Sequence, residues 1–194
     1  ATYSSYCLGR GSNYPNNMGF DSMRSVAFPN ETGPLLDAGT NGYTASYALF
    51  TNGNLYTWGY NNQGELGIGN TTRYSSPKQI GALTNWLTLS GSISGESFLA
   101  IKTDGTLWVW GSRQDGQLGL GETSDVNTIS PIQVPGDKTV KNIFAGETYT
   151  ILLTTDNKVY VTGYNGNGEL GLGNWDNVYE LTEMVLPAGK IVKN

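Results

Sequence analysis

Hydrophobic positions along the chain form short runs that alternate with polar turns. Three runs of β-branched and aromatic residues are apolar or bulky on both alternating faces: "LYTW" (55–58), "LWVW" (107–110) and "VYVT" (159–162). Strands of this kind are buried on both sides, as in a sheet packed between neighbouring sheets. No stretch shows a helical period over eleven residues. The pattern therefore predicts an all-β fold built from short strands.

A second apolar run precedes each of these segments and is joined to it by a tight turn. The earlier runs are "SYALFT" (46–51), "FLAIKT" (98–103) and "TILLTT" (150–155), and the turns are "TNGN", "TDGT" and "TDNK". Asn-Gly and Asp-Gly pairs are strong signals for β-hairpins. A further short strand is predicted later in each unit, at "PKQI" (77–80), "PIQV" (131–134) and "ELTEMV" (180–185).

The strands recur with a constant period. The segments "GYNNQGELGIG", "GSRQDGQLGLG" and "GYNGNGELGLG" align without gaps, and each begins 52 residues after the previous one. Five positions are identical in all three: Gly59, Gly111 and Gly163; Gly64, Gly116 and Gly168; Leu66, Leu118 and Leu170; Gly67, Gly119 and Gly171; Gly69, Gly121 and Gly173. A repeat of about fifty residues that contains several short strands is typical of the blades of a β-propeller.

The unit "TDGTLWVWGSRQDGQLGLG" (103–121) resembles the regulator of chromosome condensation repeat. That repeat is a blade of similar length, with a tryptophan-glycine strand followed by an L-G-x-G turn. The resemblance covers nearly the whole chain and implies a ring of seven blades. The chain departs from the family in lacking the histidine before the hairpin and in having Thr162 where the other units have Trp58 and Trp110. Its low charge and its Gly, Asn and Thr content look more like bacterial and phage versions.

The chain is expected to be a single propeller segment over residues 1–194, with an incomplete ring. One blade is predicted for each of 38–89, 90–141 and 142–186, the end of a degenerate blade for 1–37, and the start of a further blade for 187–194. In the degenerate blade, Gly9 and Gly19 match Gly59 and Gly69, but Asn16 stands where Leu66 is expected. A further segment or a second copy would complete the ring.

The glycine-rich stretch "GNGELGLGN" (166–174) raises the question of a nucleotide-binding loop. A phosphate-binding loop leads into a helix N-terminus and carries a lysine, and neither follows here or in the other two copies. Three copies at a constant spacing favour a structural corner, in which glycines allow positive φ and the leucine fills the space between blades. We therefore expect no cofactor.

Composition argues against catalysis. The chain has no histidine and one cysteine, so the commonest general base and metal ligand are missing. Glu65 and Glu169 share one repeat position, occupied by Gln117 in the middle unit, and are expected to be solvated turn residues rather than an acid–base pair. No stretch has the acidic spacing of a calcium loop. The sequence predicts no enzyme, no catalytic residue and no metal site.

Charge narrows the class of partner. The formal net charge is −5 and only 14% of residues are charged, which argues against nucleic acid because phosphate binding needs a basic surface. No run of eighteen apolar residues is present, so no membrane-spanning helix is predicted. A protein partner or a cell-surface receptor is the remaining expectation.

Binding is expected in the segments that vary between units. These are "NTTRYSS" (70–76), "ETSDVNTIS" (122–130) and "NWDNVYE" (174–180), which follow the invariant turn. Variable loops on a constant scaffold are where binding residues usually lie. Arg73, Tyr74, Trp175 and Tyr179 are of the types that anchor interfaces. An alternative role for Trp175 is to cover the edge of a blade.

Three functions remain open. The leading hypothesis is a non-enzymatic protein-interaction propeller in a phage virion, a tail or surface module that binds a receptor or other virion subunits. The second is a secreted or cell-surface bacterial propeller that binds or inhibits a protein. The third, taken from the family resemblance, is a guanine-nucleotide exchange factor. The expected location is the virion or, for the second hypothesis, the outside of the cell.

Overall fold

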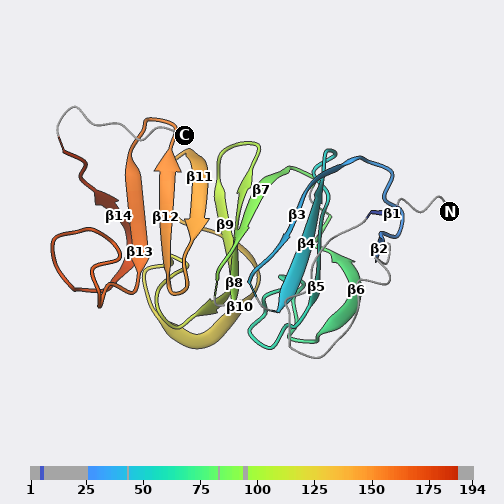
Figure 1. Cartoon of the computed structure of the whole chain (residues 1–194), viewed down its shortest axis with the longest axis horizontal. Helices are drawn as coiled ribbons and strands as arrows, with labels where there is room; N and C mark the ends of the chain where they lie inside the picture. The colour runs from blue at the N-terminus through green and yellow to red at the C-terminus, as the bar shows by residue number, and fades with distance from the viewer. Residues whose placement is uncertain (1–4, 7–25, 43, 83, 94–95, 188–194) are drawn as a thin grey trace, which may run out of the picture.

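The computed structural model describes residues 5–6, 26–42, 44–82, 84–93 and 96–187. Within these residues the regular structure is entirely β-strand. Three four-stranded antiparallel sheets stand side by side and form an open fan without a closed ring (Figure 1). This confirms the all-β, partial propeller predicted from the repeat.

The three sheets, called blades 1 to 3 below, are built in the same way from four strands in chain order. Blade 1 contains β3 (Leu35–Thr40), β4 (Ala45–Phe50), β5 (Leu55–Gly59) and β6 (Tyr74–Gln79); blade 2 contains β7 (Trp86–Gly91), β8 (Ser97–Lys102), β9 (Leu107–Arg113) and β10 (Ser124–Gln133); blade 3 contains β11 (Val140–Ala145), β12 (Tyr149–Thr154), β13 (Val159–Gly163) and β14 (Val178–Met184). A two-stranded sheet of β1 (Ser5–Tyr6) and β2 (Val26–Ala27) precedes them.

The central hairpins lie where the sequence predicts them, and the outer strands differ. The last strands are predicted from Pro77 and Pro131 onward, but β6 begins at Tyr74 and β10 at Ser124. Proline is tolerated inside these strands because each is the edge of its sheet. The first strands β3 and β7 are partly exposed and lack a continuous apolar run, so their pattern allowed no prediction. The exact blade bounds, and the partial blades at 1–37 and 187–194, stay predictions because most of those end residues lie outside the described part.

Apolar side chains fill the spaces between blades. Between blades 1 and 2, the buried cluster joins Leu49, Leu55 and Leu66 to Trp86, Phe98 and Trp110. Between blades 2 and 3, a second cluster joins Ile101, Val109 and Leu118 to Val140, Ile143 and Leu152. Leu66, Leu118 and Leu170 are each 0–1% exposed. Burial of this apolar area is what holds neighbouring blades together.

The glycine-rich turn is a corner of the backbone. All twelve repeat glycines have positive φ, between 64° and 116°. At Gly67, a Cβ would lie 2.8 Å from Trp110 Nε1 of the next blade, so any side chain there would push the blades apart. Backbone hydrogen bonds from Gly64 N to Asn61 O and from Gly67 N to Gly64 O close the turn, and no helix follows it.

The segment before β3 packs against the face of blade 1 that carries Phe50 and Tyr56. The Phe28 ring lies 5.0 Å from that of Phe50 and 5.3 Å from that of Tyr56, with edge-to-face geometry. Three residues further on, the buried Glu31 carboxylate accepts hydrogen bonds from the side-chain amides of Asn52 at 2.8 Å and Asn54 at 2.7 Å. Glu31 therefore ties this segment to the turn between β4 and β5.

The Glu31 carboxylate makes folding dependent on pH. Burial raises its pKa, but hydrogen bonds from Asn54, Gly33, Asn52 and Thr32 outweigh burial and hold the pKa below its usual value. A carboxyl whose pKa is lower in the folded chain stabilises it above the unfolded pKa, and that contribution is lost as the pH falls through the folded pKa.

We expect Glu31→Gln to reduce the free energy of unfolding by about 2 kcal/mol at pH 7, because the amide is neutral and puts a donor in the place of one of the two accepting oxygens. Denaturant unfolding of both proteins at pH 7 and pH 3 measures this. The difference in free energy of unfolding between the two proteins should be smaller at pH 3, where the wild-type carboxyl is protonated. A difference that is the same at both pH values would contradict the role assigned to the charge.

Candidate functional site

The last glycine of each turn connects one blade to the next. Gly69 N donates a hydrogen bond to Ile129 O in β10, and Gly121 N donates one to Tyr179 O in β14, both at 2.8 Å. Ile129 and Tyr179 occupy equivalent positions, because the residues before them pair with Gly111 and Gly163 in the adjacent strands. These two bonds are called the turn latch below.

A side chain covers the first glycine of each "GELGLG"-type turn, at Gly64, Gly116 and Gly168. At Gly64 a Cβ would lie 2.9 Å from Ile129, and at Gly116 it would lie 2.4 Å from the Tyr179 ring. Both covering residues come from the next blade. At Gly168, in blade 3, the nearest side chain is instead Trp175 from the same loop, at 3.1 Å.

The carbonyls at the centre of the turn accept bonds from the next blade. In blade 2, the buried Trp110 indole N–H donates to Glu65 O at 2.8 Å. In blade 3, which has Thr162 at the equivalent position, Thr150 Oγ1 donates to Gln117 O at 2.8 Å and Thr162 Oγ1 donates to Gly116 O at 2.9 Å. Two hydroxyls thus replace one indole, which explains how blade 3 tolerates the loss of the repeat tryptophan.

A buried asparagine organises the loop in blades 1 and 3, and sequence reasoning missed it. Asn61 is 0% exposed; its Oδ1 accepts from Leu66 N at 2.8 Å, and its Nδ2 donates to Asn70 O at 2.8 Å. Asn165 makes the equivalent bonds to Leu170 N and Asn174 O. In the middle unit Arg113 takes this position and pairs with Glu122 at 2.8 Å. The recurrence of asparagine at the third position of two units was the signal that could have identified it.

The expectation of solvated glutamates is wrong for Glu65. This residue is 1% exposed, because blade 2 covers the turn of blade 1. Burial raises the pKa of its carboxyl, against hydrogen bonds from backbone N–H groups that lower it. Glu169, in the last described blade, is half-buried, and a hydrogen bond from Asn167 lowers its pKa. The two carboxyls belong to different blades and do not form a catalytic pair.

The four candidate binding residues lie in three different environments: exposed loop positions, a half-buried strand position and the turn latch. Arg73 is exposed, with its guanidinium carbon 5.9 Å from the Tyr60 ring centroid. Tyr74 begins β6 and packs half-buried against the cluster between blades 1 and 2. Tyr179 is part of the turn latch and 39% exposed. Trp175 is 69% exposed, the most open aromatic side chain of the described residues. Their role in binding stays a prediction.

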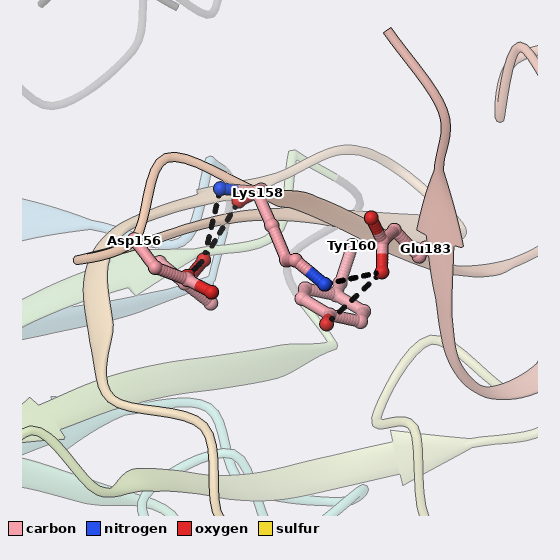
Figure 2. Close-up of polar contacts among 5 residues, drawn as sticks. Asp156, Lys158, Tyr160 and Glu183 are labelled. Carbon is pink, nitrogen blue, oxygen red and sulfur yellow. Dashed lines mark hydrogen bonds and ion pairs between the residues drawn. The ribbon is translucent and has the colours of Figure 1, made fainter.

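The opposite end of blade 3 carries a small polar cluster around the turn between β12 and β13 (Figure 2). Glu183 Oε2 lies 3.0 Å from Lys158 Nζ and accepts a hydrogen bond from the Tyr160 hydroxyl at 3.4 Å. The bond to Glu183 raises the pKa of Lys158, and burial raises the pKa of Tyr160. Both shifts favour the protonated forms of Lys158 and Tyr160, in which neither group acts as a base or nucleophile.

Residues that the structure describes include no group of three or more His, Cys, Asp or Glu side chains placed to hold a metal ion. Among the same residues, no helix is long and apolar enough to cross a membrane.

Family models match the repeat units directly. The model described as regulator of chromosome condensation (RCC1) repeat matches residues 52–91 and 104–153, and a second model of the same repeat matches residues 140–169. Together the matches cover more than half of the chain. The chain belongs to the regulator of chromosome condensation repeat family. Its bacterial or phage type stays a prediction.

Several curated proteins are similar to this RCC1-repeat chain. The ultraviolet-B receptor UVR8 of Arabidopsis thaliana is 33% identical over 134 residues, which are 68% of this chain and 30% of the receptor. The human X-linked retinitis pigmentosa GTPase regulator is 33% identical over 66% of this chain and 12% of its own length. The human E3 ubiquitin-protein ligase HERC2 is 33% identical over 71% of this chain and 3% of its own length. The chain thus spans less than a third of these relatives.

Solved structures show the same fold at low identity. A chain in the crystal structure of Kap60 bound to yeast RCC1 (Prp20) matches 90% of this chain and 42% of its own length, with a TM-score of 0.72 and 17% identity. The crystal structure of Prp20p from Saccharomyces cerevisiae matches 87% of this chain and 42% of its own, with a TM-score of 0.69 and 16% identity. These likenesses establish an RCC1-type propeller.

Proposed function

We propose that the chain is a non-enzymatic protein-binding propeller that binds through the long loops 60–73, 114–123 and 164–177. The observation that carries the proposal is that two of these loops expose aromatic side chains and are anchored on well-ordered turns. Tyr60 and Tyr164, at one repeat position, are 37% and 36% exposed, and Trp175 is 69% exposed. Beneath them, the repeat leucines and the buried asparagines hold the turns in place.

The loops suit a protein partner. Each follows the third strand of its blade and leads into the fourth, so all three lie at one end of the blades; the loop of blade 3 is at the lower left of Figure 1. Arg73 over Tyr60 adds a planar cation beside an aromatic ring, a combination enriched in interface hot spots. Similarity to yeast Prp20p, whose crystal structure is described together with its binding properties to Gsp1p and histones, supports the class of function.

The finer proposal places the chain in a phage virion, as a tail or surface subunit that binds a cell-surface receptor or neighbouring subunits. It rests on composition: a net charge of −5, few charged residues, and a sequence rich in Gly, Asn and Thr. Genes for tail or capsid proteins beside the gene for this chain would support it, whereas a signal peptide on the parent reading frame would contradict it and favour the secreted bacterial alternative.

Crosslinking of the chain in its native particle or complex tests the binding surface. We expect crosslinks to a protein partner from loops 60–73 and 164–177, and at least about tenfold fewer after Trp175→Ala and Arg73→Ala together. Phe144→Ala, which removes a 55% exposed ring from β11, is the matched control and should change nothing. Crosslinks confined to the opposite end of the blades, at turns 51–54 and 155–158, would contradict the proposal.

A further inference from the structure

One layer of side chains differs between the joint of blades 1 and 2 and the joint of blades 2 and 3. In the first joint, the layer packs with the hydrophobic cluster and consists of Ala45, Tyr74, Phe98 and Trp110. In the second joint, the residues at the equivalent positions all carry hydroxyl groups: Ser97, Thr128, Thr150 and Thr162. We propose that these four residues, called the hydroxyl layer below, form an internal site that binds a small uncharged molecule through hydrogen bonds.

Two of the hydroxyl groups come from blade 2. Ser97 and Thr128 are the Cα partners of Gly111 in the two neighbouring strands, so both lie on one face of the sheet. Ser97 shares this face of β8 with Leu99 and Ile101, which belong to the cluster between blades 2 and 3. Both residues are 5% exposed or less, and neither hydroxyl has a hydrogen-bond partner among the described residues. Because buried hydroxyls are nearly always hydrogen-bonded, this pair indicates a bound molecule as the partner.

The other two hydroxyl groups face blade 2 from blade 3. Thr150 and Thr162 are paired across β12 and β13, and each is 1% exposed. Their hydroxyls donate hydrogen bonds to Gln117 O and Gly116 O in the turn of blade 2. A hydroxyl that donates its proton keeps its oxygen lone pairs as acceptors. The layer therefore offers unpaired hydroxyls on one side and accepting oxygens on the other.

The second joint has smaller side chains than the first at a similar separation of the blades. The turn latch measures 2.8 Å at both joints, so blades 2 and 3 are not held closer together at this end than blades 1 and 2. A Cβ built on Gly67 would lie 2.8 Å from Trp110 Nε1, whereas one built on the equivalent Gly119 would lie 3.3 Å from its nearest atoms. Hydroxyl side chains thus stand where the first joint has three aromatic rings, and a small polar molecule takes the place of part of those rings.

The chemistry of the hydroxyl layer selects an uncharged ligand. None of its four side chains is ionised at neutral pH, and the charged side chain of β9, Arg113, is already paired with Glu122 at 2.8 Å. An ion buried in the layer would lose its hydration without gaining a counter-charge. The ligand must donate and accept hydrogen bonds at once, which is the chemistry of O–H groups. Water and a small polyol share this chemistry, and the experiment below distinguishes them.

Replacing Thr128 with valine tests whether its hydroxyl has a bound partner. Valine has nearly the same shape, so removing a hydroxyl that is buried and unpaired would stabilise the fold. If the hydroxyl binds a ligand, Thr128→Val should instead raise the equilibrium constant for unfolding about fivefold, measured by denaturant unfolding. Thr71→Val, at an exposed loop position, is the matched control and should change that constant by less than about twofold. A Thr128→Val variant as stable as the wild type, or more stable, would overturn the proposal.

NMR of the full chain identifies the bound molecule. In buffer without polyol, a long-lived water should give nuclear Overhauser contacts to the methyl groups of Thr128 and Thr150, and the contact to Thr150 should disappear in Thr128→Val. Added glycerol should shift the same methyl signals saturably if the site takes a polyol, and should leave them unchanged if water holds it. Methyl groups with neither a long-lived water contact nor a saturable shift would overturn the proposal. That outcome would leave the proposed protein-binding loops standing, because the hydroxyl layer is buried between the blades.

Discussion

Replacing Trp110 with alanine is expected to lower the free energy of unfolding by about 5 kcal/mol, the largest effect of any substitution considered. The ring is fully buried between blades 1 and 2, with its centroid 5.9 Å from that of Phe98 and 6.0 Å from that of Trp86. Truncating a buried tryptophan to alanine costs about 3–5 kcal/mol through lost burial and the cavity left behind. Glu65 O would also lose its indole donor while staying buried, which adds about 1–3 kcal/mol.

Denaturant unfolding measures this loss of stability. Two further variants separate the contribution of the hydrogen bond from that of the buried ring. Trp110→Phe keeps an aromatic ring against Phe98 but has no N–H for Glu65 O, so we expect a loss of about 2 kcal/mol. Thr162→Val in blade 3 removes the equivalent hydroxyl at nearly constant volume and should cost about 1 kcal/mol. If Trp110→Phe were as stable as the wild type, the hydrogen bond from the indole to Glu65 O would not help to hold blades 1 and 2 together.

Asn61→Ala is expected to destabilise the chain by about 3 kcal/mol. The side chain is fully buried and accepts one hydrogen bond, from Leu66 N, while it donates to Asn70 O and Thr72 O at 2.8 and 3.0 Å. Each such bond contributes about 1 kcal/mol, and the groups left behind have little access to water. The loop that carries Arg73 would also lose its internal support.

Asn62→Ala is the matched control, since this neighbour is exposed and its side chain donates a hydrogen bond to the Tyr60 hydroxyl at the surface. It should change the free energy of unfolding by less than about 0.5 kcal/mol. Asn61→Asp retains the acceptor and loses both donated bonds, so its cost should lie near that of Asn61→Ala. Equal stability of the Asn61 and Asn62 variants would show that the loop does not depend on the buried amide.

The sequence predicted the blades because their signals are local and repeated. Asn-Gly and Asp-Gly turns, bulky strands and glycines with positive φ each depend on a few neighbouring residues, and their recurrence every 52 residues removed ambiguity. The corner at "GELGLG" followed from the same reasoning. The early starts of β6 and β10 did not, because a proline inside an edge strand looks locally like its beginning.

Local sequence signals of this kind do not predict contacts between blades. The burial of Glu65 depends on a blade some fifty residues further along the chain, so its local turn led to the wrong expectation. The exchange of Trp110 for two threonine hydroxyls in blade 3 is visible only when donors and acceptors from both blades are placed together. Asn61 is the exception, because asparagine recurs at the third position of two units and could have been recognised.

Hydrogen exchange of three glycine amides tests the central claim that the repeat turn is a latch between neighbouring blades. Gly69, Gly121 and Gly173 occupy one repeat position and have similar φ, between 77° and 88°, so local geometry alone predicts equal exchange rates for them. We expect Gly69 and Gly121, bonded to Ile129 O and Tyr179 O, to be protected, and Gly173 to exchange at least about tenfold faster. Equal protection of all three amides would show that the bonds to Ile129 O and Tyr179 O do not protect the turn.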